Sequence, residues 1–460
     1  MRRIHRSAVA LAAGVLLAGA AAAPAQAGPD RDRGAHGVSA TTKTPYRPQQ
    51  DVRDYQRPPA GFTAVLTETA SRHGSRALSD SEDGDLLLRL WRRAADEGGL
   101  TAPGRDFGPD VQAFLDANAA VGYGQLTGRG RREMADTAAR MERRLPGLFH
   151  RIAQDAPNPA GRERIDVVSS GQKRAADSAG AFTGGLVGAD PALAPAVLPA
   201  RTDPGLLYFH KAAANADYRD YVDHDPRLAA TLAAIRDQDR THRTARRALE
   251  RVFTPAFVER IAAGEVEAGT DEVRAAQALH ALYSAAPGLS DEGDWHFGRY
   301  LGAEEADWFG YLDDAEEFYT KGPGFAGADI TYRMAGVLLD DFFARIEAER
   351  AGTGTLGAEL RFTHAEEIIP LAALMQLPGS TEQARPERPY RYADNPWRGA
   401  SVSPMGANIQ WDLFRKGDRY LVRMVYDERE TAFRPGCRPV ARGSYFYDLD
   451  ELERCFGRTA

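Results

Sequence analysis

Residues 62–76 read Phe-Thr-Ala-Val-Leu-Thr-Glu-Thr-Ala-Ser-Arg-His-Gly-Ser-Arg, and this stretch decides the fold. Its first part, residues 62–69, fits a β-strand in composition. The cluster Arg72-His73-Gly74-Ser75-Arg76 follows at once, so it would lie at the carboxyl end of that strand. Ligands bind at this edge in open α/β sheets. The stretch therefore predicts an α/β domain with a functional site around His73.

Two later segments repeat the pattern of a short strand that ends in charged side chains. The strand expected at 165–170 leads into Gly171-Gln172-Lys173-Arg174, which places Arg174 in the first turns of a helix. The strand expected at 360–363 ends in His364-Ala365-Glu366, and a helix over 367–375 follows it. Because parallel strands end at one edge of a sheet, we expect the three segments to meet there.

The rest of the chain reads mostly as helices with one further pair of strands. Apolar residues recur at helical spacing through much of 80–151. The composition of 208–350 shifts to Ala, Arg, Glu, Asp and Tyr with few β-branched runs, which predicts an inserted, mostly helical cap. Segments 408–414 and 419–427 resemble a strand pair. We therefore expect a mainly parallel sheet flanked by helices. The predicted domains are the α/β domain, residues 58–207 and 351–460, and the cap, residues 208–350.

The N-terminus has the pattern of an export signal. Arginines between residues 2 and 6 precede an alanine-rich apolar run over 8–23, and Ala25-Gln26-Ala27 provides a small-x-small cleavage site. We expect a signal peptide of residues 1–27 and a secreted, extracellular protein. A membrane anchor is the alternative, although the apolar run is short for a membrane span. Residues 28–57 are rich in Pro, Arg, Asp and Gly and are expected to form a flexible leader.

Charge and cysteine content narrow the class of partner. The formal net charge is −7, whereas nucleic-acid-binding domains usually carry a basic face, so we expect no nucleic acid as partner. Binding of an anionic small molecule remains compatible with this net charge, because the electrostatic field of a local pocket decides such binding.

The two cysteines are Cys437 and Cys455, and an oxidising compartment favours a disulfide over two free buried thiols. We expect a monomer with no other membrane-spanning segment.

The three strand ends supply a defined set of chemical groups: three arginines, two histidines and a carboxylic acid. Arginine forks match phosphate oxygens, and a neutral imidazole can attack phosphorus. A carboxylic acid can protonate a leaving alkoxide and then activate water. The set therefore indicates phosphate-ester chemistry. A metal site is the rival interpretation, but no His-Glu-x-x-His occurs and three arginines would repel a cation.

The motifs resemble those of a known family. Arg72-His73-Gly74-Ser75-Arg76 resembles the signature of the histidine acid phosphatases. His364-Ala365-Glu366, with Ile368-Ile369-Pro370-Leu371 close behind, resembles their multiple inositol polyphosphate phosphatase branch, since other branches usually carry His-Asp. The chain departs from the family at Leu78, where a proline is usual and shapes the loop. Further similar stretches are 319–324 and 426–437, within a resemblance over about 62–455.

The resemblance implies a role for each matching residue. His73 would be the nucleophile that forms a phosphohistidine, and Glu366 would be the proton donor. The scissile phosphate would be held by Arg72, Arg76, Arg174 and His364. Lys321, in the insertion, would bind a neighbouring phosphate of the substrate. The implied reaction is hydrolysis of inositol polyphosphates such as phytate at acidic pH, without metal or organic cofactor. The alternatives are a broad-specificity acid phosphatase and a secreted phosphate-ester binding protein without turnover.

Overall fold

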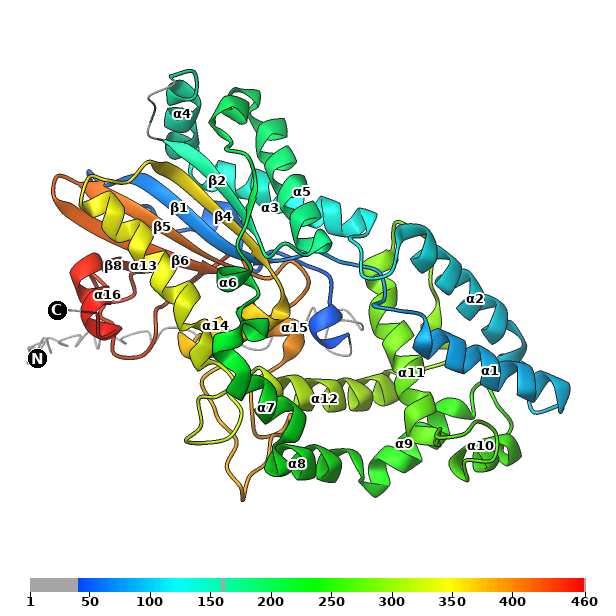
Figure 1. The fold of residues 1–460 in the computed structure, drawn as a ribbon. Coiled ribbons are helices and arrows are strands. Elements are labelled where there is room, and N and C mark those ends of the chain that lie inside the picture. The colour runs from blue at the N-terminus through cyan, green and yellow to red at the C-terminus, as the bar shows by residue number, and fades with distance from the viewer. Residues whose placement is uncertain (1–39, 159–160, 162, 459–460) are drawn as a thin grey trace, which may run out of the picture. The chain divides into compact units, whose positions relative to one another are not determined.

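A mixed β-sheet organises the described residues of this computed structural model, which are 40–158, 161 and 163–458 (Figure 1). Its strands follow the order β3-β2-β4-β1-β5-β6-β7, with β8 paired to β6. Strands β3, β2, β4 and β1 are parallel, and the remaining pairings are antiparallel. The predicted α/β class is confirmed, and the antiparallel hairpins make the sheet mixed. The strands are β1 (Thr63–Arg72), β2 (Arg164–Ser169), β3 (Arg201–Thr202), β4 (Leu356–Thr363), β5 (Asn408–Lys416), β6 (Arg419–Tyr426), β7 (Arg429–Thr431) and β8 (Phe446–Asp448).

Helices cover both faces of the sheet (Figure 1). Side chains alternate between the two faces of a strand, so Ala358, Leu360 and Phe362 of β4 share one apolar cluster. The intervening Glu359 and Arg361 point to the opposite face. On the first face lie α3 (Gly128–Arg144), α4 (Pro146–Asp155) and α5 (Lys173–Ala189), and on the second lie α6 (Pro204–Leu207), α13 (Gly336–Arg350) and α14 (Ala365–Leu374).

The remaining long helices form a helical region whose boundaries differ from the predicted cap of 208–350. Helix α1 packs against α2 and α11, so residues before 208 contribute to this region. Helix α13 packs instead on the sheet, where the rings of Phe342 and Trp411 lie 5.1 Å apart. The predicted boundaries rested on amino-acid composition, which does not show against which neighbouring element the apolar face of a helix packs. These helices are α1 (Glu82–Asp96), α2 (Gly104–Val121), α7 (Ala216–His224), α8 (Pro226–Arg236), α9 (Asp239–Leu249), α10 (Pro255–Ala262), α11 (Glu272–Ala285) and α12 (Ala303–Thr320).

The segment before β1 packs on the domain, which corrects the prediction of a flexible leader over 28–57. Residues 40–57 contain the short helices η1 (Thr41–Lys43) and η2 (Val52–Asp54). Tyr46 is buried, and its backbone N–H donates to Glu133 (3.1 Å). Apolar and backbone groups of the segment therefore find partners in the domain, despite its polar composition. Residues 28–39 and the predicted signal peptide, 1–27, lie outside the described residues.

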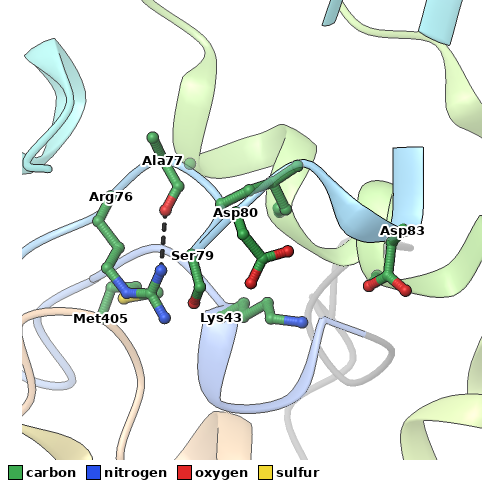
Figure 2. A pocket seen from close by; sticks show the side chains of 11 residues that line it. Lys43, Arg76, Ala77, Ser79, Asp80, Asp83 and Met405 are labelled. Carbon is green, nitrogen blue, oxygen red and sulfur yellow. Dashed lines mark hydrogen bonds between the residues drawn. The ribbon is translucent and has the colours of Figure 1, made fainter. Parts of the chain in front are cut away.

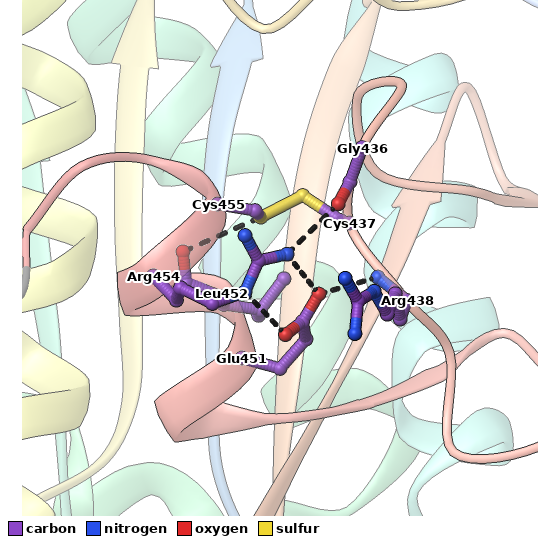
Figure 3. Close-up of a disulfide and its surroundings, with 7 residues drawn as sticks. All are labelled: Gly436, Cys437, Arg438, Glu451, Leu452, Arg454 and Cys455. Carbon is purple, nitrogen blue, oxygen red and sulfur yellow. Dashed lines mark hydrogen bonds and ion pairs between the residues drawn. A yellow bond between two sulfur atoms is a disulfide. The ribbon is translucent and has the colours of Figure 1, made fainter.

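A disulfide joins Cys437 to Cys455, as predicted (Figure 3). Cys455 is the last residue of α16 (Leu449–Cys455), and Cys437 follows β7. Arg454 donates to the carbonyl of Gly436 (2.9 Å), which adds a polar contact beside the bridge. The disulfide thus fastens the C-terminal helix to the loop between β7 and β8. No helix in the described part of the chain is long and apolar enough to cross a membrane.

A buried ion network lies between β4 and α13. The guanidinium of Arg361 is fully buried and contacts Glu68 Oε2 at 2.9 Å and Asp341 Oδ2 at 2.6 Å. It also lies 4.5 Å above the ring of Phe342. Burial alone would lower the pKa of Arg361, but Glu359, Glu68 and Asp341 together raise it. The arginine therefore stays charged and offsets Glu68, whose one ion pair within the described structure is with Arg361, whereas Glu359 and Asp341 also pair with Arg345.

We expect Arg361→Met to lower the free energy of unfolding by about 3–5 kcal/mol, the cost of leaving a buried charge without its partner. Methionine keeps much of the side-chain length but removes the charge and its hydrogen bonds. Urea denaturation followed by circular dichroism measures the change. The matched control is Arg415→Met, at an exposed position of β5, with an expected change within about 0.5 kcal/mol. A loss below about 1 kcal/mol for Arg361→Met would contradict a stabilising role.

Candidate active site

The three predicted strand ends meet at one edge of the sheet. In the order β2-β4-β1, Arg72 is paired with Thr363, and Ser169 is paired with Phe362. The backbone N–H of His73 donates to the carbonyl of Thr363 (2.9 Å). The rings of His73 and His364 lie 5.4 Å apart, edge to face. Parallel pairing thus brings together residues that are far apart in the sequence.

The loop after β1 is held tightly against α3. A Cβ atom at Gly74 would lie only 2.5 Å from the carbonyl oxygen of Gly130, so only glycine fits there. Ser75 donates through its backbone N–H (2.8 Å) and its hydroxyl (2.9 Å) to the carboxylate of Glu133. Burial raises the pKa of Glu133. These contacts fix the backbone that carries His73.

The ring of His73 is buried and has a defined protonation pattern. Its Nδ1 lies 2.9 Å from the carbonyl oxygen of Gly74. Because a carbonyl only accepts hydrogen bonds, Nδ1 carries the proton and Nε2 keeps its lone pair. Burial, with the positive charges of Arg72 and other neighbours, holds the pKa of His73 well below its usual value. The ring is therefore neutral, as a nitrogen nucleophile must be.

Three arginines surround His73 with unsatisfied donors. Arg72 donates to the carbonyls of Thr42 (2.6 Å) and Ser403 (2.5 Å), and Arg76 donates to that of Ala77 (2.8 Å). The Nε atoms of Arg72, Arg76 and Arg174 are buried without a partner in the described structure. Burial lowers the pKa of Arg72 and of Arg76 to about 10 each, so both remain charged at neutral pH. Within the described residues none of the three forms a salt bridge, which leaves a cationic cluster suited to a phosphate group.

His364 lies beside this cluster as a neutral hydrogen-bonding group. It precedes α14, and its Nε2 lies 2.8 Å from the hydroxyl of Ser170. Burial, and then the charge of Arg174, lowers the pKa of His364 to about 3. Its Nδ1 is buried and has no partner among the residues described. His364 therefore has an unused nitrogen next to the cationic cluster.

Glu366 and Lys321 form an ion pair at the margin of the cluster. Lys321 Nζ lies 3.2 Å from Glu366 Oε1 and 2.9 Å from Glu317 Oε1. Burial would raise the pKa of Glu366, but the Lys321 ammonium, as the largest opposing influence, holds it well below its usual value. The carboxyl group is thus ionised in the substrate-free protein. A bound phosphate would attract Lys321 and add negative charge, and both effects favour protonation of Glu366.

We expect Lys321→Met to shift the alkaline limb of the pH profile of kcat/KM to higher pH by roughly one unit, because an opposite charge at this distance typically lowers a carboxyl pKa by 1–3 units. Without the ammonium, the pKa of Glu366 rises and the acid form persists at higher pH. The measurement is kcat/KM for an alkyl phosphate over a pH series. Lys211→Met, at an exposed position, is the control. An unchanged alkaline limb in Lys321→Met would contradict this coupling.

Several residues that contact the site carry no signal in the sequence. The ring of Tyr208 lies 5.1 Å from that of His364. His210 Nδ1 lies 2.6 Å from Glu367 Oε1, and Thr363 donates to the same carboxylate (2.9 Å). Their positions depend on contacts between distant segments, so a local motif could not identify them. In the described parts of the chain, no group of three or more His, Cys, Asp or Glu could hold a metal ion.

Known proteins are similar to this chain over most of its length. The family model of the histidine phosphatase superfamily (branch 2) matches residues 69–427. Multiple inositol polyphosphate phosphatase 1 of Gallus gallus is 23% identical over 420 residues, which cover 87% of this chain and 84% of that protein. The Homo sapiens protein of the same name is 23% identical over 407 residues, 83% of this chain and 78% of that protein.

Two solved structures are similar to this chain over more than 90% of its length. The structure of Bifidobacterium longum multiple inositol polyphosphate phosphatase in complex with inositol hexasulfate is 32% identical, with a TM-score of 0.85. The match covers 91% of this chain and 97% of that one. The phytase from D. castellii shares the fold at 15% identity and a TM-score of 0.62, over 92% of this chain and 85% of that one. The family match spans most of the chain and includes the three strand ends, so the chain belongs to branch 2 of the histidine phosphatase superfamily.

Proposed function

We propose that the protein hydrolyses inositol polyphosphates, including phytate, through a phosphohistidine on His73. The observation that carries this proposal is a buried neutral His73 with a free Nε2 among three arginines that form no salt bridge within the described structure. The relatives named above act, by their names, on multiple inositol polyphosphates, and the Bifidobacterium longum protein was solved with inositol hexasulfate. That compound is a polyanion, which supports a polyanionic substrate here.

The proposed reaction proceeds in two steps. His73 Nε2 attacks phosphorus, the bond from phosphorus to the leaving oxygen breaks, and the Glu366 carboxyl group gives its proton to that oxygen. The Glu366 carboxylate then takes a proton from a water molecule, whose oxygen attacks phosphorus and breaks the N–P bond. Inorganic phosphate leaves, and both side chains return to their starting states. The arginines stabilise the negative charge of the phosphoryl oxygens throughout.

The test is a comparison of substrates with the purified protein. Phytate, a sugar phosphate and p-nitrophenyl phosphate are each incubated with the enzyme, and kcat/KM is determined from phosphate release. We expect the highest value for inositol phosphates, because several phosphates can use the cationic surroundings of the site. Equal or higher values for the sugar or aryl phosphate would favour a broad-specificity acid phosphatase. Binding of phytate without turnover would favour a binding protein.

The proposal also includes export from the cell. It is supported by the signal-like pattern of residues 1–27 and by the disulfide, which persists in oxidising compartments. Mass spectrometry of protein from the culture medium should give a chain that begins at Gly28. Retention of the intact N-terminus in the membrane fraction would contradict cleavage.

A further inference from the structure

A cavity of about 160 Å³ opens beside Arg76 (Figure 2). It is much larger than the ~10–15 Å³ that one water molecule needs. Its polar lining comes from three segments, namely η1, the loop between β1 and α1, and the first turn of α1. The residues of that lining are Lys43, Arg76, Ser79, Asp80 and Asp83. The cavity therefore extends the phosphate site toward the N-terminal segment.

Besides Arg76, two charged residues in this lining form no salt bridge within the described structure. Asp83 pairs with Arg274 (2.7 Å), whereas Lys43 and Asp80 form no salt bridge among the residues that the structure describes. Lys43 donates only one hydrogen bond there, to the hydroxyl of Ser284 (3.3 Å). The cavity thus presents one ammonium group and one carboxylate at the side of Arg76. Figure 2 shows both groups in the lining.

Neighbouring contacts fix both charged residues in place. The residue before Lys43, Thr42, is buried and accepts a hydrogen bond from Arg72 (2.6 Å), so η1 is attached directly to the catalytic cluster. Asp80 Oδ1 accepts a hydrogen bond from the backbone N–H of Glu82 (3.0 Å) at the start of α1. Asp80 is also close enough to Arg76 to influence its pKa. A ligand held by Arg76 would therefore meet these two charges at fixed positions.

We propose that this cavity is a specificity subsite, in which Lys43 binds a non-reacting phosphate and Asp80 accepts a hydrogen bond from a neighbouring hydroxyl. The Asp80 carboxylate repels a second phosphate at the same place. The favoured substrate class is a polyol that carries phosphates and free hydroxyls on adjacent carbons, such as a partly dephosphorylated inositol phosphate. The inference rests on the proposed function, which supplies the phosphorylated ring.

The experiment measures how a fully substituted ring binds. Inositol hexasulfate, which has no hydroxyl, is used as a competitive inhibitor of p-nitrophenyl phosphate hydrolysis. Because a hydrogen bond to a charged group is worth ~1.5–3 kcal/mol and ~1.4 kcal/mol is tenfold, we expect a Ki about tenfold higher in Lys43→Met. Because Asp80→Asn removes the repulsion between the carboxylate and a sulfate of the inhibitor, we expect a Ki about tenfold lower in this variant. The side-chain amide oxygen of asparagine can still accept the hydrogen bond from the backbone N–H of Glu82. The control is Glu82→Gln, outside the cavity lining, with an expected Ki within about twofold of the wild type.

The outcomes separate this inference from the proposed function. Each Ki should change several-fold more than the KM for p-nitrophenyl phosphate, which has no group to place in the cavity. If Ki and KM change by the same factor, or if neither variant changes Ki, the subsite is refuted. As a second measurement, the ratio of kcat/KM for an inositol monophosphate to that for phytate should fall in Asp80→Asn. If the two variants change Ki as expected but the wild-type protein does not hydrolyse phytate, the subsite is supported and the proposed substrate is refuted.

Discussion

His73→Ala is expected to reduce kcat for phosphate-ester hydrolysis by roughly 10⁴- to 10⁶-fold, the range seen when a covalent nucleophile is removed. The substitution removes the only atom that the proposed mechanism uses to attack phosphorus. The loop should keep its shape, because Gly74 packs closely against α3 and Ser75 donates to Glu133, although the substitution removes the hydrogen bond from the imidazole ring to the Gly74 carbonyl. We therefore expect the loss in kcat without a comparable loss of stability, checked by steady-state kinetics and thermal unfolding.

The intermediate gives an independent measurement. Rapid quenching of wild-type enzyme with ³²P-labelled substrate should trap label on the peptide that contains His73, and His73→Ala should trap none. The matched control is His224→Ala, at an exposed position of α7, which should keep full activity and labelling. Label on another residue, or turnover that survives in His73→Ala, would exclude His73 as the nucleophile. Absence of label in an active wild type would instead indicate direct attack by water.

The parts of the fold that could be predicted from the sequence are those with a strong local pattern. The sequence shows a short strand-like run that ends at or a few residues before Arg72, Arg174 and His364, and the structure has strands at all three places. The rule that parallel strands end at one edge then suffices to bring these residues together. The hairpin of β5 and β6 could also be predicted from the sequence, because its turn contains the glycine and aspartate that are typical of turns.

The parts that could not be predicted depend on contacts between distant segments. Thr42 and Lys43 lie in a polar stretch whose composition indicates disorder, yet Arg72 binds the carbonyl of Thr42. An arginine that needs a buried acceptor can order such a segment, and composition does not report that partner. Likewise, α13 and α12 are both helical by composition, but only α13 packs on the sheet. The salt bridge between Lys321 and Glu366 is a third case, since it joins the residue directly after α12 to α14.

Glu366→Gln is expected to lower kcat/KM for phytate by roughly 10²- to 10⁴-fold, the usual contribution of a general acid. The alkoxide of an inositol ring is a poor leaving group and needs a proton when the P–O bond breaks. The nitrophenolate of p-nitrophenyl phosphate leaves without one, so we expect a loss below about tenfold for that substrate. The two kcat/KM values, measured on the same enzyme preparation, give the leaving-group dependence directly.

The matched control is Glu317→Gln, which removes the other carboxylate that contacts Lys321. This variant should change both kcat/KM values by a similar factor, because Glu317 has no part in proton transfer. Glu366→Gln should also accumulate phosphoenzyme from p-nitrophenyl phosphate, since the same side chain activates water in the second step. A larger burst of nitrophenol in pre-steady-state kinetics would reveal this accumulation. Equal losses on both substrates in Glu366→Gln, with no burst, would show that Glu366 acts by charge alone.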